Sequence, residues 1–173
     1  MHLSLQSASN RILRSMNRPY KAESVEAFCR LARKRLGSRC MFGADIIAGF
    51  PGETDADHAE TVGFLQMETD GVPMFCNLHV FPYSERPGTP AATFHDPIPV
   101  ATRRNRASEL ESIGRRNRAA FAQTLVGQDV VVCIEKDGNG WTDEYMRMEV
   151  AATFPRRSLQ RLRASATTFG RLA

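Results

Sequence analysis

The sequence lacks the features of a membrane or secreted protein. Its 173 residues contain no apolar run approaching the ~20 residues that a membrane-spanning helix needs. The first residues include no basic segment followed by a long apolar stretch, as a signal peptide would. Ordinary shares of hydrophobic (42%) and charged (24%) residues exclude a wholly disordered chain. We therefore expect a soluble, cytoplasmic protein with no membrane partner.

Metal-binding and nucleophile motifs are missing as well. The four cysteines, Cys29, Cys40, Cys76 and Cys133, form no C-x-x-C or C-x-x-x-C-x-x-C pattern, and we interpret them as reduced core residues. The four histidines have no zinc-like spacing with one another or with a carboxylate pair, so we predict no metal site. No serine elbow or acid pair identifies a catalytic residue.

Lysine is scarce, and acidic residues are absent after Glu149. The net charge of +4 is carried mainly by arginine. Arginine suits forked contacts with phosphate, which favours a polyanionic partner. A GC-rich genome would produce the same bias, so both interpretations stay open.

Apolar periodicity predicts three strands separated by helices in the first half of the chain. Strands are expected at residues 3–6, 39–48 and 75–81, with a helix at about 23–36 and another capped by Thr54. This alternation predicts an α/β fold with a parallel sheet covered by helices.

The second half of the chain has a different pattern. A proline-rich loop over 82–99 leads to a basic helix over 100–125. A strand over 128–135, a turn at 136–140 and an alternating segment ending near Val150 then predict a hairpin. A boundary is expected near residue 126, and the tail from 153 has no clear period.

Polar and glycine-rich segments follow each of the three predicted parallel strands. They are Ser4 to Ser7, the Gly49-Phe50-Pro51-Gly52-Glu53 turn, and the loop that starts at Phe81-Pro82. Each alone is typical of a structural turn. Because the carboxyl ends of parallel strands meet at one edge, together they predict a ligand pocket there.

Three segments, in this order and spacing, are specific enough to suggest a family. They are HLSLQS at 2–7 with NRIL at 10–13 and MNR at 16–18, FGADIIAGFPGET at 42–54, and HVFPYS at 79–84 running into RPGTPAA at 86–92. Over about residues 1–150 the chain resembles the radical S-adenosylmethionine (SAM) methylthiotransferases that modify tRNA. The HVFP segment at 79–82 resembles the branch of the family that acts on threonylcarbamoyladenosine rather than on isopentenyladenosine.

The resemblance implies methylthiolation at C2 of the modified adenosine next to the anticodon. Such enzymes cleave SAM at a [4Fe–4S] cluster held by three cysteines, and a second cluster supplies the sulfur. The implied fold is the C-terminal half of a partial (β/α) barrel, followed by a truncated small β domain of the TRAM type. The implied divisions are a partial barrel over 1–97, an Arg-rich linking helix over 98–126, a partial TRAM-like domain over 127–152 and an unmatched basic tail over 153–173.

The resemblance also implies roles for individual residues. Those expected to bind SAM are Gln6, Ser7, Arg18, Ile47, Gly49, Phe81 and Pro82, with Arg18 assigned to the carboxylate. Those considered for tRNA contact are Arg103, Arg104, Arg115, Arg116 and Arg147. For the arginines of the basic helix, a solvated helix face is the alternative.

The departures from the family are large. The cluster motif and the whole amino-terminal domain of the family have no counterpart in these 173 residues. We therefore expect a carboxyl-terminal fragment that is inactive without the missing N-terminal portion of the enzyme. A non-catalytic RNA-binding remnant and an inactive gene fragment are the alternatives.

Overall fold

The first of two compact units in the chain is built on a parallel sheet. The computed structural model describes residues 1–165 and 169, and the units are Met1–Asn117 and Arg118–Ala173. In the first unit, β1 (His2–Gln6), β2 (Phe42–Ala48) and β5 (Phe75–Pro82) pair in the order β1-β2-β5, all parallel. The predicted α/β fold with a parallel sheet is confirmed.

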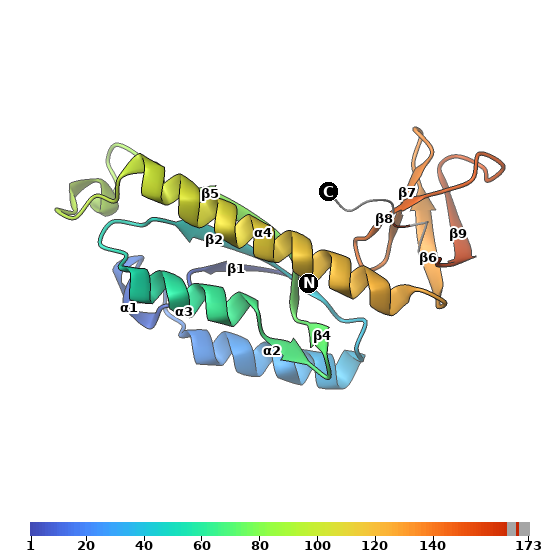
Figure 1. Ribbon diagram of the computed structural model, residues 1–173, viewed down its shortest axis with the longest axis horizontal. Helices are drawn as coiled ribbons and strands as arrows, with labels where there is room; N and C mark the ends of the chain where they lie inside the picture. Colours follow the sequence, from blue (N-terminus) through green and yellow to red (C-terminus); the bar gives the residue numbers. More distant parts are fainter. Residues whose placement is uncertain (166–168, 170–173) are drawn as a thin grey trace. The chain divides into compact units, whose positions relative to one another are not determined.

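Helices run alongside this sheet (Figure 1). They are α1 (Asn10–Ser15), α2 (Ala22–Leu36), α3 (Asp55–Leu65) and α4 (Val100–Leu125), with the short elements β3 (Glu68–Thr69), β4 (Val72–Pro73) and η1 (Pro90–Thr93) between them. No helix in the described part of the chain is both long and apolar enough to cross a membrane. Helix α4 begins in the first unit and ends in the second.

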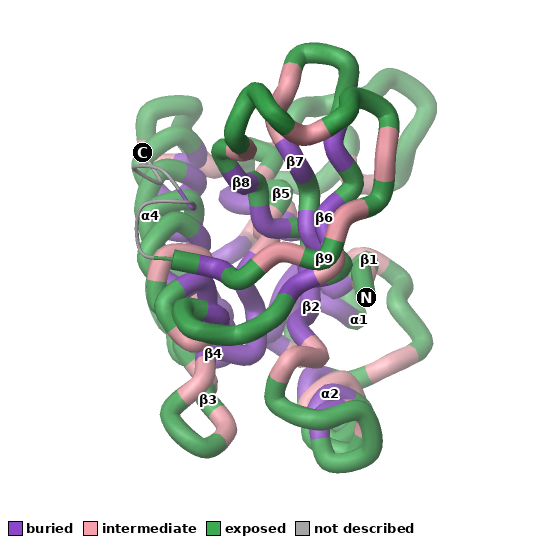
Figure 2. The backbone as a smooth tube through the Cα atoms, turned by 90° about the vertical axis from the view of Figure 1, so that its right-hand side faces the viewer, coloured by how far each residue is buried: buried purple, intermediate pink, exposed green. Residues whose placement is uncertain are grey.

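The two faces of the parallel sheet differ in chemistry. Alternate residues of β2, such as Phe42, Ala44 and Ile46, are fully buried in a core shared with α2, α3 and α4, and Figure 2 shows most of β2 as buried. The residues between them lie on the other face, where Asp45 and Ile47 are only half-buried. This second face carries the polar side chains of the sheet.

The second unit contains an antiparallel sheet with the order β8-β7-β6-β9. Its strands are β6 (Asp129–Ile134), β7 (Asn139–Thr142), β8 (Arg147–Glu149) and β9 (Ser158–Arg163). The expected turn joins β6 to β7, and the expected alternation is confirmed, since Met146 and Met148 are buried while Arg147 and Glu149 are exposed. The identification of this sheet as a TRAM-like domain stays a prediction.

One feature of the second unit differs from the expectation. Strand β9 pairs with β6 although this tail has no clear period, because the exposed side of the strand carries both the apolar Leu159 and the charged Arg161 and Arg163. The second unit comprises residues 118–173 and so includes the end of α4, and the expected division near residue 126 stays a prediction. Residues 166–168 and 170–173 of the expected basic tail lie outside the described residues.

The start of α3 is fixed by one carboxylate. Thr54 is the N-cap, as predicted, and it forms a capping box with Asp57. Asp57 also accepts hydrogen bonds from Ser9 Oγ (2.6 Å) and from Arg11, so it joins α3 to the beginning of α1. Burial raises the pKa of Asp57, but the hydrogen bonds from Arg11, Ser9 and Thr54 lower it by a larger amount. The pKa of Asp57 is therefore well below its usual range.

Replacement of Asp57 by asparagine is expected to reduce the acid sensitivity of the fold. A carboxylate with a depressed folded-state pKa stabilises the protein above the ordinary Asp pKa, and this stability is lost as the pH falls below it. Between pH 5 and 3, the free energy of unfolding from urea titrations should fall by about 1 kcal/mol more in the natural chain than in Asp57→Asn. Asp96→Asn, at an exposed site, is the control, and equal pH dependence in all three proteins would contradict this role.

Candidate functional site

The three parallel strand ends meet at one pocket of about 510 Å³. Gln6 lies at the end of β1, Asp45 and Ile47 lie on β2, and Phe81 and Pro82 end β5. The loop after β5 completes the lining with Tyr83, Ser84, Arg86, Thr89 and Ala91. A pocket of this size and mixed lining is typical of small-molecule sites, which lie at this edge of α/β sheets.

Four residues singled out from the sequence line this pocket, and three do not. Gln6, Ile47, Phe81 and Pro82 are brought together here. Ser7 is buried, and its hydroxyl accepts a hydrogen bond from the Ser9 N–H at 3.1 Å. Arg18 is exposed and is not among the lining residues, and neither is Gly49. Asp45 and Arg86 line the pocket but were not singled out.

Gly49 lies next to the side chain of Arg103, and its expected contact with SAM stays a prediction. Its φ of +75° favours glycine, but a Cβ here would lie 2.5 Å from Cγ of Arg103. The group that requires a glycine is therefore the side chain of Arg103, which lies over this turn.

Arg103 is held by hydrogen bonds within the first unit, and its contact with tRNA stays a prediction. It is only 6% exposed. Its guanidinium donates hydrogen bonds to the carbonyl oxygens of Ile98 (2.6 Å) and Tyr83 (2.9 Å) and to the carboxylate of Glu85 (2.7 Å). Because all three guanidinium nitrogens donate within the protein, the side chain fixes the loop after β5.

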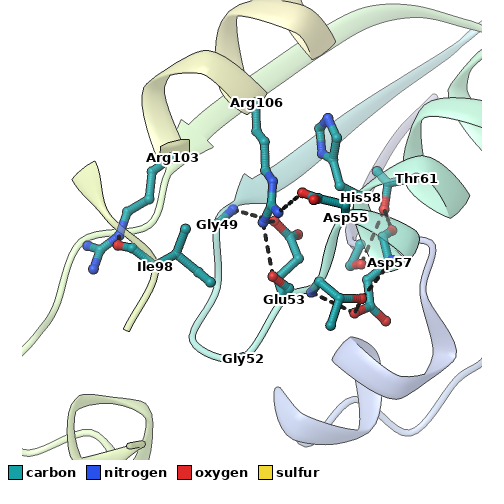
Figure 3. A network of polar contacts seen from close by, with 12 residues as sticks. Gly49, Gly52, Glu53, Asp55, Asp57, His58, Thr61, Ile98, Arg103 and Arg106 are labelled. Atoms are coloured by element: carbon teal, nitrogen blue, oxygen red, sulfur yellow. Dashed lines mark hydrogen bonds and ion pairs between the residues drawn. The ribbon is translucent and has the colours of Figure 1, made fainter. Parts of the chain in front are cut away.

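Arg106 fixes the turn after β2 in a similar way, by hydrogen bonds to Glu53 (Figure 3). Its Nη1 donates to the Glu53 carboxylate (2.8 Å) and to the Glu53 carbonyl oxygen (3.1 Å). Glu53 in turn accepts a hydrogen bond from the Gly49 N–H at 2.8 Å. Burial raises the pKa of Glu53, and the bond from Gly49 and the charge of Arg106 offset part of that rise.

A signal for these two inward arginines was present in the sequence. Arg103 and Arg106 are three residues apart and in phase with Ala107, Leu110 and Ile113, which form the buried stripe of α4. Their positive charge alone places them with the other basic residues of the helix, which are expected to face solvent or tRNA. Four of the arginines considered for tRNA contact are exposed, namely Arg104, Arg115, Arg116 and Arg147. Their contact with RNA stays a prediction.

The cysteines do not fit an iron–sulfur cluster. Cys29 is buried, and this burial raises the pKa of its thiol to about 12, whereas cluster ligation requires a thiolate. Cys133 is exposed in the second unit. Within residues 1–165 and 169, His2, Asp45 and His79 lie close enough together to hold one metal ion. This group contains no cysteine.

Removal of Arg106 is expected to cost more stability than removal of its exposed neighbour. Arg106→Met leaves the buried Glu53 carboxylate without its cation, and loss of one partner from a buried ion pair costs about 3–5 kcal/mol. Arg104→Met should change the free energy of unfolding by less than about 0.5 kcal/mol. Urea denaturation followed by circular dichroism measures both, and similar midpoints for the two variants would contradict the role of Arg106.

Comparison with known proteins finds both a superfamily model and curated relatives that match parts of this chain. Residues 1–65 match the model of the Radical SAM superfamily. The chain is 36% identical over 138 residues to a tRNA-2-methylthio-N(6)-dimethylallyladenosine synthase of Novosphingobium aromaticivorans, an alignment covering 80% of this chain and 30% of that protein. It is 35% identical over 138 residues to the synthase of the same name from Agrobacterium fabrum, covering 80% of this chain and 29% of that protein.

The chain therefore spans about 30% of the length of the curated relatives it matches. The superfamily match covers β1 and β2, which contribute Gln6, Asp45 and Ile47 to the pocket, and it ends before β5 and the loop that supply the rest of the lining.

Proposed function

We propose that this chain forms the SAM-binding side of a tRNA methylthiotransferase. The observation that carries the proposal is the pocket shared by Gln6, Ile47, Phe81 and Pro82 at the carboxyl ends of three parallel strands. Ligands bind at this edge in α/β sheets and barrels. The superfamily match over residues 1–65 supports SAM as that ligand.

The lining residues match the parts of SAM in chemistry. Ile47 and Phe81 offer apolar surface for the adenine ring, and Phe81 is 53% exposed before any ligand binds. Pro82 has a carbonyl acceptor but no N–H, which suits the exocyclic amine of adenine. Gln6 can hydrogen-bond the ribose or the amino-acid part. Arg86 lines the pocket, so it is better placed than Arg18 for the carboxylate.

We further propose that these 173 residues do not complete the reaction alone. The family implies SAM and iron–sulfur clusters: one SAM, cleaved at a reduced cluster, would supply the radical, and a second SAM would supply the methyl group. The chain contributes the pocket that orients SAM, but its four cysteines do not fit a cluster. The thiolate ligands would have to come from residues other than these.

Two adenosine derivatives are candidate substrates. The HVFP segment at 79–82 favours N6-threonylcarbamoyladenosine. The names of the relatives specify dimethylallyladenosine, which favours the second candidate. The two nucleosides differ at N6, because a threonylcarbamoyl group carries a carboxylate and a dimethylallyl group is purely apolar.

The second unit supports tRNA as the partner. Trp141 and Arg147 are directly paired across β7 and β8, and both are exposed. The guanidinium of Arg118 lies 6.0 Å from the centre of the Trp141 ring. Arginine beside an exposed aromatic ring is a common combination in proteins that bind single-stranded RNA. The same surface supports the alternative of an RNA-binding protein without catalysis.

SAM binding by the 173-residue chain tests the proposal. Equilibrium dialysis with labelled SAM should detect binding, and Phe81→Ala should weaken it about tenfold, the loss expected for removing an aromatic wall. Phe28→Ala is the matched control, because Phe28 is similarly exposed (47%) but lies outside the pocket.

Two results would contradict the proposal. One is equal SAM affinity in the natural chain and Phe81→Ala. The other is an absence of SAM binding in a chain that still binds tRNA with a steep salt dependence, which would favour the RNA-binding alternative.

A further inference from the structure

Three potential metal ligands lie side by side on the polar face of the parallel sheet. Asp45 of β2 and His79 of β5 are directly paired across the two strands. His2 of β1 is paired with Gly43, two residues before Asp45, and therefore lies on the same face. The three side chains come from adjacent strands. The exposed fraction of the side chain is 37% for His2, 28% for Asp45 and 53% for His79.

The polar atoms of the three side chains are directed at one another. Asp45 Oδ1 lies 2.8 Å from His2 Nε2 and 3.2 Å from His79 Nδ1. The centres of the two imidazole rings are 4.7 Å apart. One ligand atom from each residue lies within 4.8 Å of the other two, so a single ion can reach all three.

The neighbouring Gly43 provides the space that this arrangement needs. A Cβ at residue 43 would lie 2.4 Å from Nδ1 of His2 and 2.9 Å from the carbonyl oxygen of Asn77. Any larger residue would move the His2 ring off the surface of β2. A histidine that only faced solvent would not require such a position for its ring.

We propose that His2, Asp45 and His79 bind one divalent transition-metal ion of the Zn²⁺ type. Two imidazole nitrogens and one carboxylate oxygen are the donor set that zinc, cobalt and nickel accept, whereas Mg²⁺ and Ca²⁺ prefer oxygen ligands alone. Three protein ligands leave at least one coordination position open.

Asp45 also lines the pocket at the strand ends, so the proposed ion would lie close to that pocket. An oxygen or nitrogen atom of a molecule in that pocket could therefore complete the coordination. The proposal goes beyond the methylthiotransferase assignment, because the ion requires neither SAM nor tRNA.

Metal titration of the chain alone tests this site. After treatment with EDTA and dialysis, the 173-residue chain should bind one Zn²⁺ by isothermal titration calorimetry. His79→Ala and Asp45→Ala should each weaken the affinity about 100-fold or more, since even outer-shell changes cost 10- to 100-fold. Gly43→Ala should weaken it about tenfold by displacing the His2 ring. His95→Ala, at an exposed histidine of the loop before α4, should leave it unchanged.

Two further measurements distinguish this site from metal binding at a cysteine and from misfolding of a variant. Cys133→Ser removes the exposed thiol and should retain Zn²⁺ binding. Circular dichroism should show that His79→Ala is folded, and Co²⁺ should give visible absorption bands in the natural chain that are absent from this variant. The proposal is overturned if the natural chain binds no Zn²⁺, if binding is unchanged in His79→Ala and Asp45→Ala, or if it is lost in Cys133→Ser.

Discussion

The buried ion pair between Arg106 and Glu53 is the interaction on which the rest of the first unit depends. It attaches α4 to the turn that follows β2, and through Glu53 it also holds the Gly49 N–H. Arg103, one turn earlier on the same helix face, holds the loop after β5 through Tyr83 and Glu85. Two of the three strand ends are thus fixed by one helix, and the pocket between them has a defined shape.

The parallel sheet separates stability from chemistry by its two faces. One face is apolar and fully buried, with Phe42 and Ile46 in the core, and it holds the unit together. The other face carries Asp45, Ile47 and His79, which are half-buried or exposed and can therefore meet a ligand. The pocket and the proposed metal site are neighbours on this face because both use alternate residues of the same strands.

Periodicity and turn chemistry were sufficient to predict the three parallel strands and the longer helices from the sequence, but not β9. The Thr54 N-cap, the helix over 100–125 and the three parallel strands all follow from local patterns. Local patterns cannot state which residues meet across strands. His2 and Asp45 are 43 positions apart and come into contact only through strand register, so a search for zinc-like spacing along the chain missed them. The inward direction of Arg103 and Arg106 was missed because their charge was given more weight than their phase on the helix.

A crystal structure of the 173-residue chain grown with SAM would test the central claim most directly. We expect the adenosine moiety in the pocket that Gln6, Ile47, Phe81 and Pro82 share, with its adenine against Ile47 and Phe81 and the Arg106–Glu53 pair intact. Adenosine density elsewhere, such as in the polar groove lined by Arg11, Arg14 and Glu60, would contradict it.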